Sequence, residues 1–453
     1  MNYRITTLIF FISGFVTQIH AQPALIGSCW KGNFEDAWNR KQEVEIRFHL
    51  DQLPLNPQIT TPTASIHIPD FVFAQDLKSK FETDERTLLF GTNYGMANLH
   101  WIDPNHLTGF IPLKADTLTL DLKQVECPAL PKPTRNKELQ IDVGDLELGG
   151  TLFLPADSSQ PIACAVFVHG KKCRDRTRFI SRAIKLAEAG MAAFVFDKRG
   201  SPPTSSDPAK TTLEQHASDL ARIIEYLSVE PGIDPYKIGL IAYSTGGWVS
   251  PLAIQKTRLP AAFFVTVVGP AISTEDYNKH WFPEMIWRKS GQNIKARNLA
   301  TDYINLAYSN LPAPKRAREM NSILRIAQKK GWANFIGYEY EVRTEHDLPR
   351  LWTARHLYDP EIHLSRLKCP VLSILGEADW VMPAETNYAE FVRIFRGTDK
   401  SNYKLLKVPN ANHSMKLLKP ENDGSPPEIF TRMAPESWFG ILDFLKEIKI
   451  LEE

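Results

Sequence analysis

Three residues of this 453-residue sequence have the types and the chain order needed for nucleophilic catalysis: Ser244, Asp379 and His413. A serine hydroxyl becomes a strong nucleophile only when a base removes its proton, and the base needs a partner that orients it. Each of the three follows an apolar run, and they occur in the order Ser, Asp, His. The pattern predicts acyl-transfer chemistry through a covalent intermediate.

Ser244 lies in the stretch "YKIGLIAYSTGGWVSP". The apolar run Ile238–Ala242 indicates a buried strand, and the segment from Gly247 onward is typical of a helix. A strand that passes into a helix through one residue makes a sharp turn, in which flanking side chains would collide. Ala242 and Gly246 relieve that crowding and leave the serine hydroxyl exposed at the sheet's edge, as in the G-x-S-x-G nucleophile elbow. The alternative is a tight glycine-rich turn with an incidental serine.

The acid and the base are expected beyond two later strands. Asp379 closes the strand-like run "PVLSILGEAD", and His413 lies in "KVPNANHSM". Glu377 is a rival acid, but Asp379 is preferred because it falls at the tip of the turn. Taken singly, Asp379 could cap a helix and His413 could be an ordinary loop histidine. Their joint order and position favour the catalytic interpretation.

Two backbone N–H groups are candidates for stabilising the oxyanion that forms during acyl transfer. One belongs to Thr245, on the turn into the helix. The other belongs to Lys171, which follows the strand end His169-Gly170 in "FVHGKKCRDR". Gly170 would allow the tight turn that directs this N–H inward.

The chain divides into two domains by pattern. Residues 1–21 are expected to be a signal peptide, because Arg4 precedes the short apolar run "LIFFISGFV" and Ala21 is a plausible cleavage position. An uncleaved membrane anchor is the alternative. Residues 22–133 alternate as short strands, as in "EVEIRFHL", and predict a small β-sandwich or barrel that ends in the proline-rich "CPALPKPTRN".

Residues 134–453 alternate apolar strands with helical patterns, which predicts an α/β fold with a mostly parallel sheet and helices on both faces. "LEQHASDLARIIEYLS" is one such helix, with a capping box at Thr211 and Glu214. A helical insertion at about 272–363 is expected to form a cap over the site; the alternative is an insertion packed elsewhere. The insertion is rich in aromatic residues: Trp281, Phe282, Trp287, Trp332, Phe335, Tyr338, Tyr340 and Trp352.

Composition gives no reason to expect nucleic acid or an anionic membrane as a partner, and no stable membrane insertion is expected. With 43% hydrophobic and 23% charged residues and a net charge of +1, the chain is an ordinary globular protein without a basic surplus. Export would permit disulfides. Cys29 and Cys127 lie near the two ends of the first domain and are expected to pair, whereas Cys164 and Cys369 are expected to be buried thiols. No metal-ligand spacing is present, and no cofactor is expected.

The sequence resembles the α/β-hydrolase superfamily from about Lys137 to Glu453, because "VHG…DR", "FVFDKRG", "AYSTGG", "GEADWVMP" and "NANHSM" occur in the family's order. It is most similar to exported bacterial serine hydrolases, esterases or serine aminopeptidase-like enzymes, whose β-domain often opens with a W-x-G motif like "SCWKGNF". Three departures are Ala242 for the usual glycine, "RGSPPT" without the common second glycine, and Lys171-Lys172 in the oxyanion loop.

Together these observations predict an exported, periplasmic or secreted, serine carboxylesterase that acts on a small-molecule ester without a cofactor. The aromatic cap would suit an apolar or aromatic substrate group, unless its rings pack inward. A peptidase or amidase with the same triad is the nearest alternative, in which Glu284 or Glu339 would anchor a peptide amine. A catalytically inactive binding protein on this fold is a third. The oligomeric state is left open.

Overall fold

The computed structural model describes residues 25–35, 41–53, 56–67, 77–83, 86–92, 95–112, 117–127, 133–157, 160–172, 174–202, 204, 211–398, 400–418 and 433–452. The expected signal peptide at 1–21 and Cys173 lie outside these ranges. Within them, none of the helices combines the length and the apolar character needed to cross a membrane.

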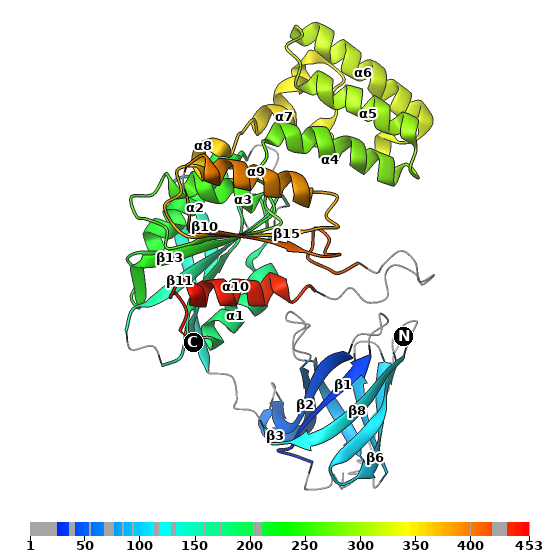
Figure 1. The fold of residues 1–453 in the computed structure, drawn as a ribbon, viewed down its shortest axis with the longest axis vertical. Helices are drawn as coiled ribbons and strands as arrows, with labels where there is room; N and C mark the ends of the chain where they lie inside the picture. Colours follow the sequence, from blue (N-terminus) through cyan, green and yellow to red (C-terminus); the bar gives the residue numbers. More distant parts are fainter. Residues whose placement is uncertain are drawn as a thin grey trace, which may run out of the picture. The chain divides into compact units, whose positions relative to one another are not determined.

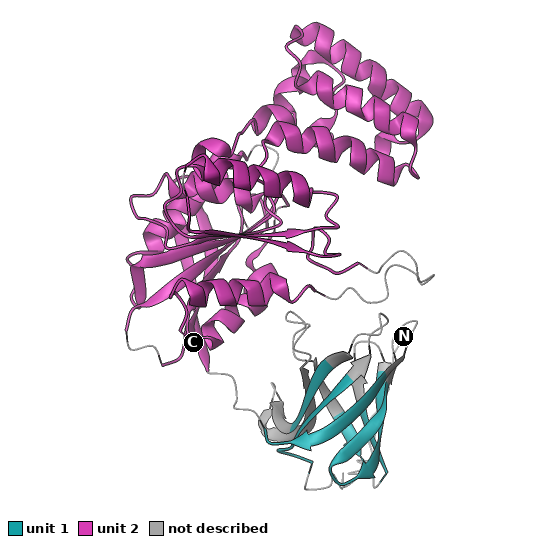
Figure 2. Ribbon diagram, in the orientation of Figure 1, with its two compact units in different colours: residues 1–129 teal, residues 130–453 magenta. Residues whose placement is uncertain are grey.

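The chain forms two compact units, residues 1–129 and 130–453 (Figure 2). Their boundary falls inside the proline-rich segment "CPALPKPTRN".

The first unit is a closed eight-stranded barrel, in which every strand pairs antiparallel with its neighbours and β1 also pairs with β8. The alternation in the sequence explains why these residues form strands: Val44, Ile46 and Phe48 are buried, whereas Glu43 and Glu45 between them are not. Of the two architectures expected, the barrel is therefore the one present. Its strands are β1 Cys29–Glu35, β2 Lys41–Leu53, β3 Asn56–His67, β4 Leu77–Thr83, β5 Thr87–Thr92, β6 Gly95–Asp103, β7 His106–Pro112 and β8 Thr117–Val125.

A disulfide joins Cys29 to Cys127, with the two Cα atoms 5.0 Å apart. Cys29 opens β1 and is in register with Val125 at the end of β8, so the bond lies at the seam where the barrel closes. Cys164 and Cys369 are free, buried thiols, as expected.

The second unit contains an eight-stranded sheet in the order β16-β15-β14-β13-β11-β12-β10-β9 (Figure 1). The pairs from β12 through β16 are parallel, and β10 pairs antiparallel with β12 and β9. Helices cover both faces, so the central strands are continuous apolar runs such as "AAFVF" of β12, in which every residue is buried. The strands are β9 Thr134–Asp142, β10 Glu147–Pro155, β11 Ile162–Val168, β12 Ala192–Phe196, β13 Ile233–Tyr243, β14 Phe264–Val267, β15 Val371–Gly376 and β16 Tyr403–Val408.

Helices α1 and α10 lie on one face of this sheet, and α2, α3 and α9 lie on the other (Figure 1). Their bounds are α1 Ile180–Glu188, α2 Leu213–Leu227, α3 Gly246–Ile254, α9 Ala384–Arg396 and α10 Glu436–Glu447, with the 3₁₀ helix η1 Arg176–Phe179 before α1. The predicted capping box of α2 was wrong by one residue. Thr212, not Thr211, is the N-cap, because its hydroxyl accepts from the Gln215 N–H at 3.1 Å.

The helical insertion leaves the sheet after β14 and returns before β15. The expected mostly parallel sheet with helices on both faces, the helical insertion and the preceding all-β unit are thus present. The insertion's α-helices are α4 Thr274–Lys289, α5 Ile294–Ala307, α6 Ala313–Lys330, α7 Trp352–Arg355 and α8 Glu361–Leu364; its 3₁₀ helices are η2 Ala333–Phe335, η3 Tyr338–Tyr340 and η4 Glu345–Arg350.

Replacing Cys29 and Cys127 together with serine should lower the stability of the barrel. The bond closes a loop with a sequence separation of 98 residues. Under the chain-entropy model such a loop contributes up to about 4–5 kcal/mol to the free energy of unfolding. Differential scanning calorimetry should show a lower melting temperature for the barrel, while folded protein keeps its turnover. Peptide mapping of unreduced protein by mass spectrometry provides the control, and two free thiols in protein from its native compartment would contradict the bond.

Candidate active site

Ser244 occupies a strained position between β13 and α3. Its backbone φ is 52°, in the left-handed region that residues other than glycine rarely adopt. The Ser244 N–H donates to the Val267 carbonyl of β14 at 3.0 Å, and the Ser244 carbonyl accepts from the Gly247 N–H at 2.7 Å. These bonds hold the turn that the elbow pattern predicts.

The crowding expected around this turn is present. A Cβ added to Gly246 would lie 2.9 Å from the His169 carbonyl oxygen, closer than real contacts allow. A Cβ on Gly170 would lie 3.2 Å from the Cβ of Ser244. The loop after β11 therefore packs directly against the serine because both positions lack a side chain.

A hydrogen-bonded chain runs from Ser244 through His413 to Asp379. The Nε2 of His413 lies 2.9 Å from the Ser244 Oγ, and its Nδ1 lies 2.7 Å from the Asp379 Oδ2. An ionised carboxylate only accepts hydrogen bonds, so we assign the proton to Nδ1, which leaves Nε2 as the acceptor for the serine hydroxyl. The three sequence-predicted residues thus lie in the arrangement that a general base and its orienting acid require.

The Asp379 carboxylate is fixed from its other side. Its side chain is fully buried, and its Oδ1 accepts from the N–H groups of Val381 at 2.8 Å and Met382 at 2.9 Å. The rival acid, Glu377, is exposed, and its backbone N–H donates to the Val408 carbonyl. Asp379 is therefore the carboxylate that orients His413.

The two expected oxyanion donors flank the serine. Thr245 follows it directly and precedes α3, and Lys171 follows Gly170, whose Cα faces Ser244. A residue that the sequence analysis missed, Lys198, donates from its Nζ to the carbonyls of Gly170 at 2.7 Å and Lys171 at 3.2 Å. These bonds fix the peptide planes of the loop, and the motif "FVFDKRG", which contains Lys198, was the available signal.

The Lys171 side chain extends into a ring of aromatic residues of the insertion. Its Nζ lies 4.9, 5.1 and 5.0 Å from the ring centroids of Trp281, Tyr340 and Trp352, and 3.8 Å from the Glu339 carboxylate. Burial lowers the pKa of Lys171 to about 8, although Glu339 opposes that shift. All four partners belong to the insertion, so cation–π contacts tie the cap to the oxyanion loop.

Several aromatic residues of the cap pack inward, including Tyr340 and Trp352 of the ring around Lys171. Phe282, Tyr340, Trp332 and Trp352 are buried, and Phe282 stacks on Tyr303 with ring centroids 5.7 Å apart. Much of the aromatic content of the cap therefore serves its own core and the Lys171 cage, whereas Tyr277 and Trp281 also line the cavity at Ser244.

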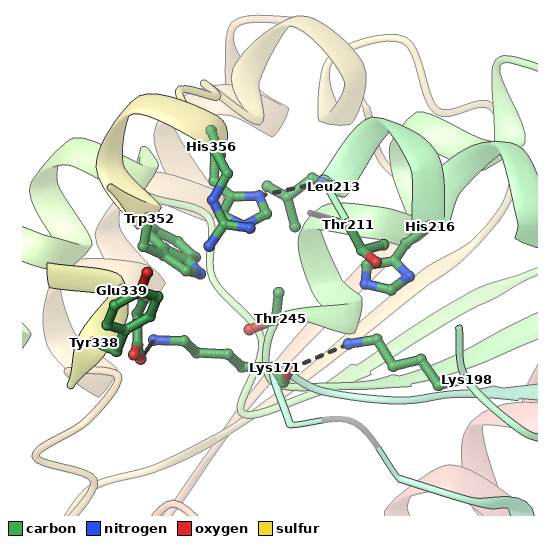
Figure 3. A pocket seen from close by; sticks show the side chains of 11 residues that line it. Lys171, Lys198, Thr211, Leu213, His216, Thr245, Tyr338, Glu339, Trp352 and His356 are labelled. Carbon is green, nitrogen blue, oxygen red and sulfur yellow. Dashed lines mark hydrogen bonds and ion pairs between the residues drawn. The ribbon is translucent and has the colours of Figure 1, made fainter. Parts of the chain in front are cut away.

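Two cavities adjoin this centre. The larger, about 360 Å³, opens onto Ser244 and His413 and is also lined by Tyr277 and Trp281 of α4. The smaller, about 270 Å³, lies beside Thr245 (Figure 3). It is lined by Lys171, Lys198, Thr211, Leu213, His216, Thr245, Tyr338, Glu339, Trp352, Arg355 and His356.

Figure 3 shows Lys171 directed toward Glu339 and Lys198 directed toward the Lys171 carbonyl. Burial lowers the pKa of His356 to about 3 and the pKa of His216 well below its usual value, which favours the neutral form of both imidazoles. In the part of the chain that the structure describes, no group of three or more His, Cys, Asp or Glu side chains could hold a metal ion.

Comparison with known proteins gives distant structural matches. No family model matches the sequence, and no curated protein matches it. A thermophilic esterase from Thermogutta terrifontis is 17% identical over 70% of this chain and 93% of its own, with a TM-score of 0.43. The α/β hydrolase GrgF from Penicillium sp. sh18 is 16% identical over 70% of this chain and 98% of its own, with a TM-score of 0.42. Est1E from Butyrivibrio proteoclasticus, with ferulic acid bound, is 15% identical over 68% of this chain and 99% of its own, with a TM-score of 0.42. At these values we take no residue role and no substrate from them.

Replacing Asp379 with asparagine should reduce kcat by about three to four powers of ten, because an amide no longer holds His413 in the productive tautomer. Glu377→Gln is the matched control and should have little effect, since Glu377 is exposed and the carboxylate bonded to His413 Nδ1 is that of Asp379. Steady-state kinetics on one activated ester would compare the two. If Glu377→Gln proved the more damaging change, Asp379 would not be the orienting acid.

Proposed function

We propose that this protein is a serine hydrolase, and specifically a carboxylesterase. The observation that carries the proposal is the continuous hydrogen-bonded chain Ser244–His413–Asp379, with distances of 2.9 and 2.7 Å, at the wall of a cavity of about 360 Å³.

The chemistry follows from the geometry. Ser244 Oγ attacks the ester carbonyl while His413 Nε2 takes its proton. The N–H groups of Thr245 and Lys171 stabilise the oxyanion, and His413 then donates the proton to the departing alcohol. Water, activated by His413 in the same way, hydrolyses the acyl-enzyme and restores Ser244. Residues of this chain perform every proton transfer, so the proposed reaction needs no cofactor.

Ester rather than peptide hydrolysis is supported by the state of two carboxylates that could have anchored a peptide amine. Glu284 is buried and paired with Arg288 at 2.9 Å and Arg297 at 3.4 Å. Glu339 lies 3.8 Å from the Lys171 Nζ. Neither lines the cavity at Ser244, and Glu339, which lines the adjoining cavity beside Thr245, is already engaged by the Lys171 ammonium.

We also propose that the protein is exported. The short apolar run near the N-terminus and the Cys29–Cys127 bond both support this, because stable disulfides form in oxidising compartments.

Changing Ser244 to alanine should abolish turnover, with a loss on the order of 10⁴-fold or more, while the fold is kept. A fluorophosphonate probe should label the wild-type protein at Ser244 and leave the alanine variant unlabelled, as mass spectrometry of the labelled peptide would show. Circular dichroism controls for folding. Labelling at another serine, or retention of more than a few per cent of activity by the variant, would refute the assignment of Ser244 as the nucleophile. A wild-type protein with neither labelling nor turnover would favour an inactive binding protein.

A direct substrate comparison separates esterase from peptidase. Short-chain p-nitrophenyl esters should be hydrolysed with kcat/KM at least about a hundredfold above aminoacyl-p-nitroanilides, which corresponds to about 2.7 kcal/mol of transition-state stabilisation. The esters release p-nitrophenol and the anilides release p-nitroaniline, and both products are followed by absorbance. The reverse ranking would identify an aminopeptidase.

A further inference from the structure

The described residues that line the cavity at Ser244 carry a marked excess of positive charge. Among the described residues that line it there is no aspartate or glutamate. It is lined by five cationic side chains from one segment: Lys171, Lys172, Arg174, Arg178 and Arg182.

Some cations of that segment form ion pairs with carboxylates, and others do not. Arg176 forms an ion pair with Asp197 at 2.8 Å and another with Glu138, and Lys171 is held by Glu339 and the aromatic cage. Lys172, Arg174 and Arg178, by contrast, have no carboxylate of a described residue within 4.0 Å. The chain therefore neutralises some of these charges internally and leaves others, on exposed residues, at the wall of the cavity.

Two arginines are held close to Ser244 by aromatic rings. Arg178 of η1 and Arg182 of α1 lie over the Phe179 ring, at 5.7 and 5.9 Å from its centroid. The Arg182 guanidinium also lies 5.2 Å from the centroid of Tyr243, the residue before Ser244. Partial desolvation lowers the pKa of Arg178, although the residue as a whole is exposed, and repulsion from Arg182 and Arg174 lowers it further. Clustered like charges of this kind are stabilised when an anion binds among them.

We propose that the Ser244 cavity selects esters that carry a carboxylate beyond the scissile bond, and that Arg174 and Arg178 bind this carboxylate. The planar guanidinium fork matches a carboxylate, and a cavity lined by one sign of charge raises the local concentration of ligands of the opposite sign. The inference rests on the proposed esterase function and adds the class of substrate to it.

The test compares matched esters that differ in one charge. The acyl-side pair is 4-nitrophenyl hydrogen adipate and 4-nitrophenyl methyl adipate; the alcohol-side pair is 4-acetoxybenzoate and 4-acetoxybenzamide. In at least one pair the charged ester should have kcat/KM about tenfold or more above the neutral one at low salt. The pair that shows the preference places the carboxylate on the acyl or the alcohol side. The preference should decline in about 0.5 M NaCl, where screening shortens the range of the field.

Variants then assign the charge to its residues. Arg178→Gln and Arg174→Gln should each lower the ratio of charged to neutral kcat/KM by about three- to tenfold, and Arg178→Lys should restore part of it. Arg318→Gln, at an exposed arginine of α6 in the cap, is the matched control and should leave the ratio as in the wild type. Circular dichroism checks that each variant folds, and the neutral ester normalises for any general loss of activity.

The outcomes separate the two proposals. If the fluorophosphonate probe labels Ser244 but neutral and charged esters are cleaved equally well in both pairs, the carboxylate preference is overturned. The proposed esterase function would then still hold. A preference that survives both glutamine variants would overturn the assignment of Arg174 and Arg178. Absence of both labelling and ester cleavage would instead refute the proposed function itself.

Discussion

The left-handed backbone of Ser244 is the constraint on which the site depends. A residue other than glycine in this conformation costs on the order of 1–3 kcal/mol, so the surrounding structure has to enforce it. The bond from the Ser244 N–H to Val267 and the absence of a side chain at Gly246 allow the turn. The close approach of Gly170 then brings the oxyanion loop against the serine.

The parallel sheet supplies the remaining parts of the site from distant positions in the chain. Strands β13, β15 and β16 run in the same direction, so Ser244, Asp379 and His413, which follow their carboxyl ends, meet at one edge. The His413–Ser244 contact spans 169 residues of sequence. The insertion between β14 and β15 begins at that same edge, which places Trp281 in the wall of the cavity.

The features that could be predicted from the sequence are those that a local pattern of apolar and polar residues encodes. Apolar runs that end in polar residues predicted the strands, and chain order then predicted the contact of Asp379 with His413. The cage around Lys171 and the bonds from Lys198 could not be predicted, because they join segments far apart without a periodic signal. The hairpin of β9 and β10 was missed for a related reason: β9 is largely exposed and lacks an apolar run.

The positive charge of the cavity has opposite effects on the two charges that form during the proposed reaction. It stabilises the oxyanion and a substrate carboxylate, but it disfavours the imidazolium that forms when His413 takes the serine proton. Asp379 offsets the second effect, since its buried carboxylate lies 2.7 Å from His413 Nδ1 while two backbone N–H groups fix it. The contacts of Lys171 also reduce the effect of its charge on the His413 imidazolium, because its ammonium is directed to Glu339 and three rings. In the proposed reaction only the backbone N–H of Lys171 then acts at the oxyanion.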